Sequence, residues 1–159
     1  MTHSPLHLDH QVCFGLYSLS RQVIQRYQPL LKPLGLTYPQ YLVMLVMWQA
    51  HEEGEANVAV KHICERLLLD TGTVTPLLKR MEGQGVLLRQ RSRQDERVVE
   101  LALTADGLSL REQASKIPAQ LLCHSGLTIE QAQAMNQTLR GWLTQLMSAD
   151  MADADSTPL

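Results

Sequence analysis

Apolar residues recur with a helical period in two short neighbouring segments near the middle of the chain. The inward positions, spaced i, i+3, i+4 and i+7 in each segment, are Val60, Ile63, Cys64 and Leu67, then Val74, Leu77, Leu78 and Met81. Residues 70–73 are turn and helix-cap types, and Pro76 fits the first turn of the second helix, where its missing N–H needs no partner. Two short helices across a tight turn, the first over residues 58–67, are typical of a helix-turn-helix.

The second of these helices has a polar and basic face opposite its apolar one. That face carries Thr73, Thr75, Lys79 and Arg80. Hydroxyls and cations on one exposed helical face can bond phosphates and base edges in the major groove of DNA. On these residues alone, the solvated face of an ordinary helix is the better interpretation. The choice between this and a DNA-recognition helix therefore depends on the flanking segments.

A β-hairpin is predicted directly after this helix. Two glycines can end the helix, and residues 86–91 and 97–103 are strand-like runs around a polar loop. The second run alternates apolar with other residues, which is the period of a half-buried strand. The hairpin carries Arg89, Arg91, Arg93 and Arg97. A basic hairpin beside such a helix predicts a winged helix-turn-helix, whose arginines can enter a minor groove.

Long amphipathic helices are predicted on both sides of the winged segment. Asp9 can cap a first helix that runs to about residue 31 and carries two overlapping apolar stripes. A helix that is apolar on two sides is buried on two sides, so its second partner is expected to be another subunit. The predicted fold class is mainly α with a small β-hairpin wing, as an intertwined helical homodimer. Its two recognition helices would meet half-sites roughly 34 Å apart, which predicts double-stranded DNA with a palindromic operator.

We expect five parts in chain order. These are a flexible N-terminal arm at residues 1–8, N-terminal helices for dimerisation and sensing at 9–57, a winged helix-turn-helix DNA-binding domain at 58–103, C-terminal dimerisation helices at 104–147 and a disordered acidic tail at 148–159. Thr104 should cap the helix after the wing, and Pro118 should kink or restart it. The last helix should open with a capping box formed by Thr128 and Gln131.

Composition places the chain among folded globular proteins and locates its positive charge. Of the 159 residues, 45% are apolar and only 4% are aromatic, which predicts an aliphatic core. The formal net charge is −2, yet residues 77–97 hold six cations against three anions, a local basic patch of the kind that binds DNA. The sequence has no long apolar run and no secretion-signal pattern, so we expect a cytoplasmic protein without membrane contact.

Three cysteines offer candidate redox chemistry. Their spacing fits no zinc motif, and no disulfide framework is expected in a cytoplasmic chain, so no metal or other cofactor is predicted. Cys64, on an apolar helix face, is interpreted as a buried, inert thiol. Cys13 lies near the start of the first helix, where the helix dipole favours a thiolate, and the phenols of Tyr17, Tyr27 and Tyr38 could hold it. Position alone leaves open both a reactive thiol and a packed core thiol.

Several motifs resemble those of the MarR family of winged helix repressors. They are TPLLKRMEGQGVL at residues 75–87, DERVVELALT at residues 95–104 and the helix opening LTADG. The segments LDHQVCFGLYSLSR at residues 8–21 and YQPLLKPLGLTYPQYLVMLVMW at residues 27–48 are similar to the organic hydroperoxide-sensing branch, the OhrR type. The resemblance covers most of the chain. It implies that Cys13 is the peroxidatic thiol and that Tyr27 and Tyr38 hydrogen-bond it across a subunit interface.

We therefore expect a repressor whose reduced dimer binds DNA. Its expected contacts are Thr73, Thr75, Lys79 and Arg80 in the major groove and Arg91, Arg93 and Arg97 on the wing, where an ion pair from Asp95 would orient Arg97. An organic hydroperoxide, the inducer, would oxidise Cys13 and release the operator. The branch that the chain resembles divides in two: one-cysteine members form mixed disulfides with small thiols or are overoxidised, and two-cysteine members close an intersubunit disulfide. Cys123 stands at about the right place for the resolving cysteine of the second kind. From the residues alone, Cys123 also fits a core position at a helix end.

Other interpretations stay open from the sequence. A repressor of the same fold that is released by a non-covalent phenolic or carboxylate ligand would make Cys13 incidental. A thiol peroxidase is disfavoured, because the sequence has no CxxC motif and no thioredoxin-like alternation of strands and helices, so we do not expect an enzyme. A helical interaction module without DNA would leave the wing arginines without a use.

Overall fold

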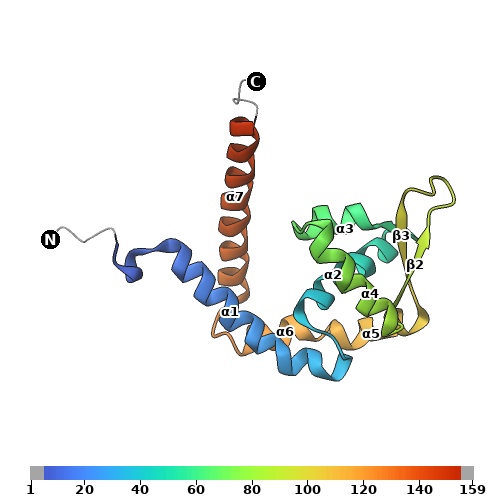
Figure 1. Ribbon diagram of the computed structural model, residues 1–159. Helices are drawn as coiled ribbons and strands as arrows, with labels where there is room; N and C mark the ends of the chain where they lie inside the picture. Colours follow the sequence, from blue (N-terminus) through green and yellow to red (C-terminus); the bar gives the residue numbers. More distant parts are fainter. Residues whose placement is uncertain (1–5, 155–159) are drawn as a thin grey trace. The chain divides into compact units, whose positions relative to one another are not determined.

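The structure is a computed structural model that describes residues 6–154 (Figure 1). The predicted arm and tail therefore lie partly outside the described residues, at 1–5 and 155–159. The chain divides into two compact units, Met1–Ile117 and Pro118–Leu159. The described part is mainly helical with a small antiparallel sheet, which confirms the predicted fold class.

The first unit contains the winged helix. Its α-helices are α1 (Val12–Leu31), α2 (Tyr38–Glu52), α3 (Val60–Leu67), α4 (Thr71–Gly83) and α5 (Ala105–Ala114), with short 3-10 helices η1 (Leu8–His10) and η2 (Lys32–Leu34). Its strands are β1 (Val58–Ala59), β2 (Leu87–Arg91) and β3 (Val99–Leu103), in the sheet order β1-β3-β2. The succession of α3, α4 and the β2–β3 hairpin is the helix-turn-helix and wing that the periodicity predicts.

The strand β1 is a feature that the sequence pattern missed. We predicted a helix from residue 58, but α3 begins at Val60, and Val58 and Ala59 pair with Leu101 and Glu100 of β3. Strand β2 occupies the other edge of β3, in a register that places Arg89 opposite Leu101. A free strand edge leaves backbone groups without partners, so the two residues before α3 are drawn into the sheet.

The core of the first unit is mostly aliphatic, as the composition predicts. Its fully buried large side chains are Leu31, Tyr41, Val43, Met44, Ile63, Val74, Leu78, Met81, Leu87, Leu101 and Ile117. Three of the four predicted inward positions of α4, Val74, Leu78 and Met81, are fully buried, and Leu77 is partly buried against them. The apolar period therefore identified the buried face of α4 correctly.

Polar side chains fix where the main helices begin. The Asp70 carboxylate accepts the backbone N–H of Thr73 at 2.9 Å at the start of α4. The Thr104 hydroxyl accepts the N–H of Gly107 at 2.9 Å at the start of α5 and donates to the Gly85 carbonyl at 2.6 Å. Thr104 thus caps α5 as predicted and also ties it to the turn after α4.

The predicted cap of α1 and the predicted position of Pro76 within α4 are wrong. Asp9 does not cap α1: residues 8–10 form the 3-10 helix η1, and α1 begins at Val12 after Gln11. Pro76 is not in the first turn of α4, because Asp70 already starts the helix at Thr71 and places Pro76 in its second turn. There the proline ring removes one N–H from the helical hydrogen-bond ladder.

The second unit is built on one long helix. Helix α6 (Ile117–Cys123) leads into it with Pro118 in its first turn, so the helical chain restarts there after α5 ends at Ala114. Helix α7 (Ile129–Ala154) opens with the predicted capping box, in which Thr128 N–H donates to Gln131 at 2.9 Å and Gln131 N–H to Thr128 at 3.2 Å. Residues 148–154, predicted as part of the tail, are helical.

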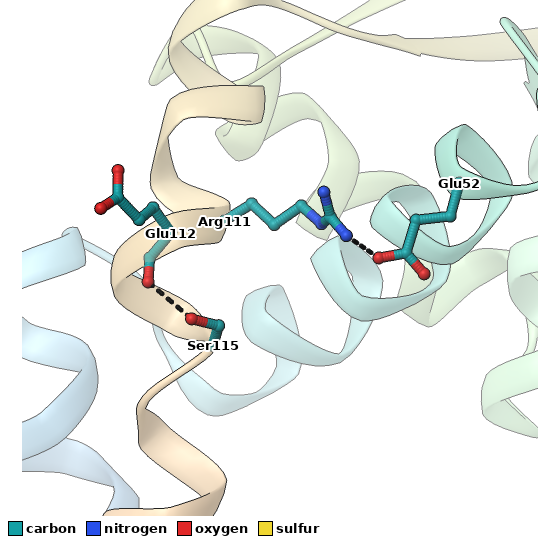
Figure 2. Close-up of polar contacts among 4 residues, drawn as sticks. All are labelled: Glu52, Arg111, Glu112 and Ser115. Carbon is teal, nitrogen blue, oxygen red and sulfur yellow. Dashed lines mark hydrogen bonds and ion pairs between the residues drawn. The ribbon is translucent and has the colours of Figure 1, made fainter.

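Two polar contacts tie α5 to α2 within the first unit. The indole N–H of Trp48 donates to the carbonyl of Gly107 at 3.0 Å in a buried position. Figure 2 shows the second contact, in which the Arg111 guanidinium reaches across from α5 to the Glu52 carboxylate at the end of α2. Since both side chains of this ion pair are about half exposed, the buried Trp48 contact is the stronger restraint.

The cap of α4 gives a pH-dependent prediction. Hydrogen bonds from the side chain and backbone of Thr73 hold the pKa of Asp70 below its ordinary value. The stability that this carboxylate contributes should be complete above its unfolded-state pKa of about 3.9 and should be lost as the pH falls through the folded-state pKa. Asp70→Asn keeps an acceptor oxygen but cannot titrate. Thermal unfolding across acid pH should show a steeper loss for wild type than for Asp70→Asn, and equal slopes would contradict this assignment.

Candidate nucleic-acid interface and thiol site

Helix α4 presents the polar face that the sequence predicts. Lys79 and Arg80 are exposed and Thr75 is partly exposed on it. Within residues 6–154, neither cation is held in an ion pair. Thr73 is also exposed, but its hydroxyl donates to the Asp70 carboxylate at 2.8 Å. Thr73 therefore stabilises the helix start, while the two cations remain available to a phosphate.

The loop between β2 and β3 projects away from the helices (Figure 1) and presents exposed arginines. Arg93 and Arg97 lie in the loop, and Arg91, also exposed, is the last residue of β2. Arg91 Nη1 donates to the carbonyl of Glu96 at 2.7 Å, which braces the loop across its base. The predicted ion pair between Asp95 and Arg97 is not formed in the described chain. Asp95 Oδ1 instead accepts the backbone N–H of Arg97 at 3.0 Å, because an aspartate readily bonds the backbone two residues on and so shapes the turn.

Arg89 does not contribute to the exposed basic patch, although its position in the sequence suggests that it would. Its backbone N–H donates to Glu82 Oε1 at 3.2 Å, and its Nη1 lies 3.7 Å from Glu82 Oε2. The side chain is only 21% exposed, and its Nε is buried without a partner among the described residues. Arg89 thus joins the end of α4 to the wing strand β2, and the cations left for a ligand are those of α4 and the loop.

The exposed cations of α4 predict a salt-dependent effect on DNA binding. Lys79→Ala should weaken binding to all duplexes about equally and make the plot of log affinity against log salt shallower by about one unit, because one phosphate contact is lost. Titrations at several salt concentrations measure both effects. Lys116→Ala, which removes an exposed lysine just after α5, is the matched control. A slope that Lys79→Ala leaves unchanged would exclude Lys79 from the interface.

Cys13 is an exposed thiol in the first turn of α1. The backbone N–H groups of a helix start favour an anion such as a thiolate. Tyr17 stands one turn along on the same face, 59% exposed, and its oxygen accepts a hydrogen bond from Arg21 Nη1 at 3.2 Å. The structure therefore excludes the packed core thiol as a description of Cys13 within its own chain.

The other two predicted partners of the thiol lie together, Tyr27 in the second half of α1 and Tyr38 at the start of α2, and Tyr27 is far from Cys13 along α1. The ring centroids of the two tyrosines are 4.9 Å apart, and Tyr41, which the sequence reasoning did not single out, lies 5.7 Å from Tyr27. Burial, with the neighbouring Tyr41 and Tyr38, raises the pKa of Tyr27 to about 12, so the phenol stays a hydrogen-bond donor at neutral pH. Cys13 precedes Tyr27 by about 21 Å of helix, so the two cannot meet within one chain.

An open cavity lies beside this tyrosine cluster. It has a volume of about 520 Å³, and its lining residues are Ile24, Gln28, Lys32, Gly35, Leu36, Thr37, Tyr38 and Pro39. Ile24, Leu36 and Pro39 are apolar, while Gln28, Lys32, Thr37 and Tyr38 bring side chains that can donate hydrogen bonds. The site thus has a mixed lining, with an apolar part beside the Tyr38 phenol.

The other two cysteines occupy different environments. Cys64 is partly buried against the core, and its Sγ lies 3.9 Å from the Thr71 hydroxyl. Cys123 is exposed at the end of α6, in contrast to the core position that its apolar neighbours also allow. Leu121 and Leu122 beside it are partly buried.

Large apolar side chains are exposed along α1 and α7. On α1 they are Val12, Phe14, Tyr17 and Leu19, and on α7 they are Ile129, Met135, Leu139, Leu143, Leu146 and Met147. Exposed apolar stripes of this length are typical of surfaces that another molecule covers. None of the helices in the described part of the chain combines the length and apolar character needed to cross a lipid bilayer.

Comparisons with known proteins agree with this geometry. The family described as transcriptional regulator SarA/Rot matches residues 25–114. The chain is 46% identical over 130 residues to the organic hydroperoxide resistance transcriptional regulator of Bacillus subtilis, covering 82% of this chain and 83% of that protein. Among solved structures, reduced AbfR bound to DNA matches with a TM-score of 0.71 and 32% identity, over 88% of this chain and 94% of that one. Disulfide-formed AbfR matches with a TM-score of 0.61 and 32% identity, over 86% and 92%.

These relatives are transcriptional regulators and not enzymes, in agreement with the exposed α4 face and the projecting wing. The predicted family is confirmed by the match in both sequence and structure over most of the chain. The chain belongs to the MarR family of winged helix-turn-helix transcriptional regulators and is of the OhrR type.

Proposed function

We propose that this DNA-binding regulator is a homodimeric repressor that senses organic hydroperoxides through Cys13. The observation that carries the proposal is the separation of the exposed Cys13 thiol from the Tyr27–Tyr38 pair along α1. A thiolate needs donors, and these phenols are kept protonated by burial. A second subunit is the means by which thiol and phenols would come together.

The exposed apolar stripes of α1 and α7 support the homodimer. Covering such stripes with a second copy removes apolar surface from water at roughly 25 cal/mol per Å². In a two-fold dimer, Cys13 of each subunit would face Tyr27 and Tyr38 of the other. The two α4 helices would then read the half-sites of a palindromic operator.

The proposed chemistry is a two-electron oxidation of the thiol. The Cys13 thiolate attacks the outer oxygen of the hydroperoxide, the O–O bond breaks, and the alkoxide leaves with a proton as an alcohol. The sulfur becomes a sulfenic acid while the peroxide is reduced. The apolar part of the cavity beside Tyr38, formed by Ile24, Leu36 and Pro39, would favour a hydroperoxide with an organic tail over hydrogen peroxide.

Cys123 is the proposed resolving thiol. Its sulfur would attack the sulfenic acid of the partner subunit, forming an intersubunit disulfide and releasing water. Exposure of Cys123 at the end of α6 supports this role, while partly buried Cys64 is the weaker candidate. The disulfide would pull on the helices that hold the dimer together, the two α4 helices would lose the half-site spacing, and the operator would be released.

The proposed DNA contacts combine one helix face and one loop. Thr75, Lys79 and Arg80 would contact the major groove, with Thr73 holding the start of α4, and Arg91, Arg93 and Arg97 would contact the DNA from the wing, on a turn shaped by Asp95. The local excess of cations in this region gives the charge that such an interface needs.

Non-reducing gel electrophoresis and intact mass, before and after one equivalent of cumene hydroperoxide, test the thiol chemistry. DNA affinity is followed in parallel on a duplex selected from a random-sequence pool with the reduced protein. A cross-linked dimer that appears as affinity falls, and that Cys123→Ser abolishes while Cys64→Ser does not, is expected. An added small-thiol mass on Cys13 without a dimer would exclude the resolving role of Cys123. No change in mass or affinity would overturn the redox proposal in favour of a non-covalent ligand.

A further inference from the structure

We propose that Gln40 and Gln84 are positioning residues that couple the tyrosine site to the end of α4. The role given to Tyr38 as the sensed position rests on the function proposed above. The coupling itself rests on a chain of hydrogen bonds within the first unit, between the start of α2 and the end of α4.

The chain of contacts is continuous. Gln40 Oε1 accepts the N–H of Thr37 at 2.9 Å, and Gln40 Nε2 donates to Gln84 Oε1 at 2.9 Å. Gln84 Nε2 in turn donates to the carbonyl of Gly35 at 3.2 Å. Two side-chain amides thus close a ring that runs from the loop before Tyr38 to the C-cap of α4 and back.

Each end of this ring touches a functional element. Tyr38 is the first residue of α2, directly after Thr37 and two residues before Gln40, so a shift of the Tyr38 backbone would move the turn that holds the Gln40 amide. Gln84 caps α4, and its backbone N–H donates to the carbonyl of Arg80 at 2.9 Å. A change at Tyr38 therefore reaches the turn that presents Arg80 through two side chains.

Burial makes the Gln40 end of the connection stiff, while Gln84 at the other end is exposed. Gln40 is only 3% exposed, one of the few buried polar side chains of the described core. A buried amide that loses a partner is costly, so Gln40 cannot simply release Gln84 to follow Tyr38. The end of α4 must move with the start of α2, or Gln40 must exchange one arrangement for another. Either way, the two sites share one equilibrium, and the influence is reciprocal.

A double-mutant cycle on the full-length protein under reducing conditions tests the coupling without any peroxide. The affinity for the selected duplex is measured for wild type, Tyr38→Ala, Gln84→Met and the double variant. Methionine fills the volume of glutamine, cannot donate a hydrogen bond and is only a weak acceptor. We expect the effect of Tyr38→Ala on affinity to change by about five-fold when Gln84 is replaced. Additive effects, within about two-fold, would overturn the proposal.

Further variants separate a coupling role from simple packing. Gln84→Glu keeps the acceptor that Gln40 Nε2 needs and should restore the coupling that Gln84→Met removes. Gln49→Met is the matched control, because Gln49 also lies on α2 and is hydrogen-bonded, to Glu53 and Arg66, outside the ring. The assignment is contradicted if Tyr38→Ala has the same effect on affinity in the Gln84→Met background as in wild type. It is also contradicted if Gln49→Met alters that effect as much as Gln84→Met does. Thermal unfolding confirms that each variant is folded, and Tyr38→Phe replaces Tyr38→Ala if the latter is not.

The peroxide response distinguishes a failure of this inference from a failure of the proposed function. Wild type should lose DNA affinity on treatment with cumene hydroperoxide, and Gln84→Met should lose several-fold less while Cys13 is oxidised to the same extent by mass. This result would support both the redox function and the coupling. If wild type does not respond, the redox function fails, while the reducing cycle still decides the coupling. An equal response in wild type and Gln84→Met, together with an additive cycle, would remove the coupling alone.

Discussion

Replacing Cys13 with serine is expected to leave DNA binding unchanged and to abolish the response to organic hydroperoxides. The serine hydroxyl has nearly the same size as the thiol, so α1 and the exposed face around it should keep their structure. A hydroxyl without an adjacent base is not nucleophilic enough to attack a peroxide. Fluorescence anisotropy on the selected duplex, before and after cumene hydroperoxide, measures the effect. Wild type should lose affinity by about ten-fold or more, within the range of allosteric coupling, and the variant should not change.

Cys64→Ser is the control for this experiment, since Cys64 is the thiol that packs against the core beside Thr71. It should respond to the peroxide as wild type does. A Cys13→Ser protein that cumene hydroperoxide still releases from DNA would exclude Cys13 as the sensor. A Cys64→Ser protein that fails to respond would indicate that the sensing thiol is Cys64, in the helix-turn-helix.

Substituting Gly107 by alanine should strongly destabilise the fold. A Cβ at this position would overlap the backbone carbonyl oxygen of Val86 and would lie 2.9 Å from the carbonyl carbon of Val86. Neither atom belongs to a flexible side chain, so α5 must shift, and the contacts of Gly107 with Thr104 and Trp48 shift with it. Overpacking of this kind costs about 3 kcal/mol, which urea unfolding would detect as a lower midpoint.

Gly83→Ala is the matched control, because a Cβ at Gly83 would meet no atom within 4 Å. Gly83 is the last residue of α4, and alanine is the better helix former there. Its unfolding midpoint should equal or exceed that of wild type. A Gly107→Ala protein as stable as Gly83→Ala would show that α5 does not approach the turn after α4 closely in solution.

Local sequence patterns were enough to place the helix-turn-helix and its wing. The spacing of Val74, Leu78 and Met81 defines one buried stripe only if the segment is helical, so the pattern fixed both the element and its inward face. Cap residues did the same for helix starts, as Thr104 and Thr128 show. These predictions hold because caps and stripes depend on residues within a few positions of one another.

Predictions that needed a choice among nearby polar groups were less secure. Residue type predicts a cap at Asp9, yet α1 begins after Gln11. Asp70, one of the predicted cap residues, does start α4, but Pro76 lies one turn later in that helix than predicted. Asp95 was expected to pair with Arg97 through its side chain and bonds its backbone N–H instead. Several partners of similar energy compete within one turn, and a difference of about 1 kcal/mol decides among them.

The sequence by itself determined which residue types this protein places on its recognition helix and wing, and the fold that presents them. Only the tertiary structure decided that Arg89 binds Glu82, that Tyr27 meets Tyr38, and that Gln40 reaches Gln84, 44 residues away in sequence. The reason is physical. A helical stripe is set by local periodicity, whereas a contact between distant residues depends on how all the stripes pack together, and no single segment encodes that packing.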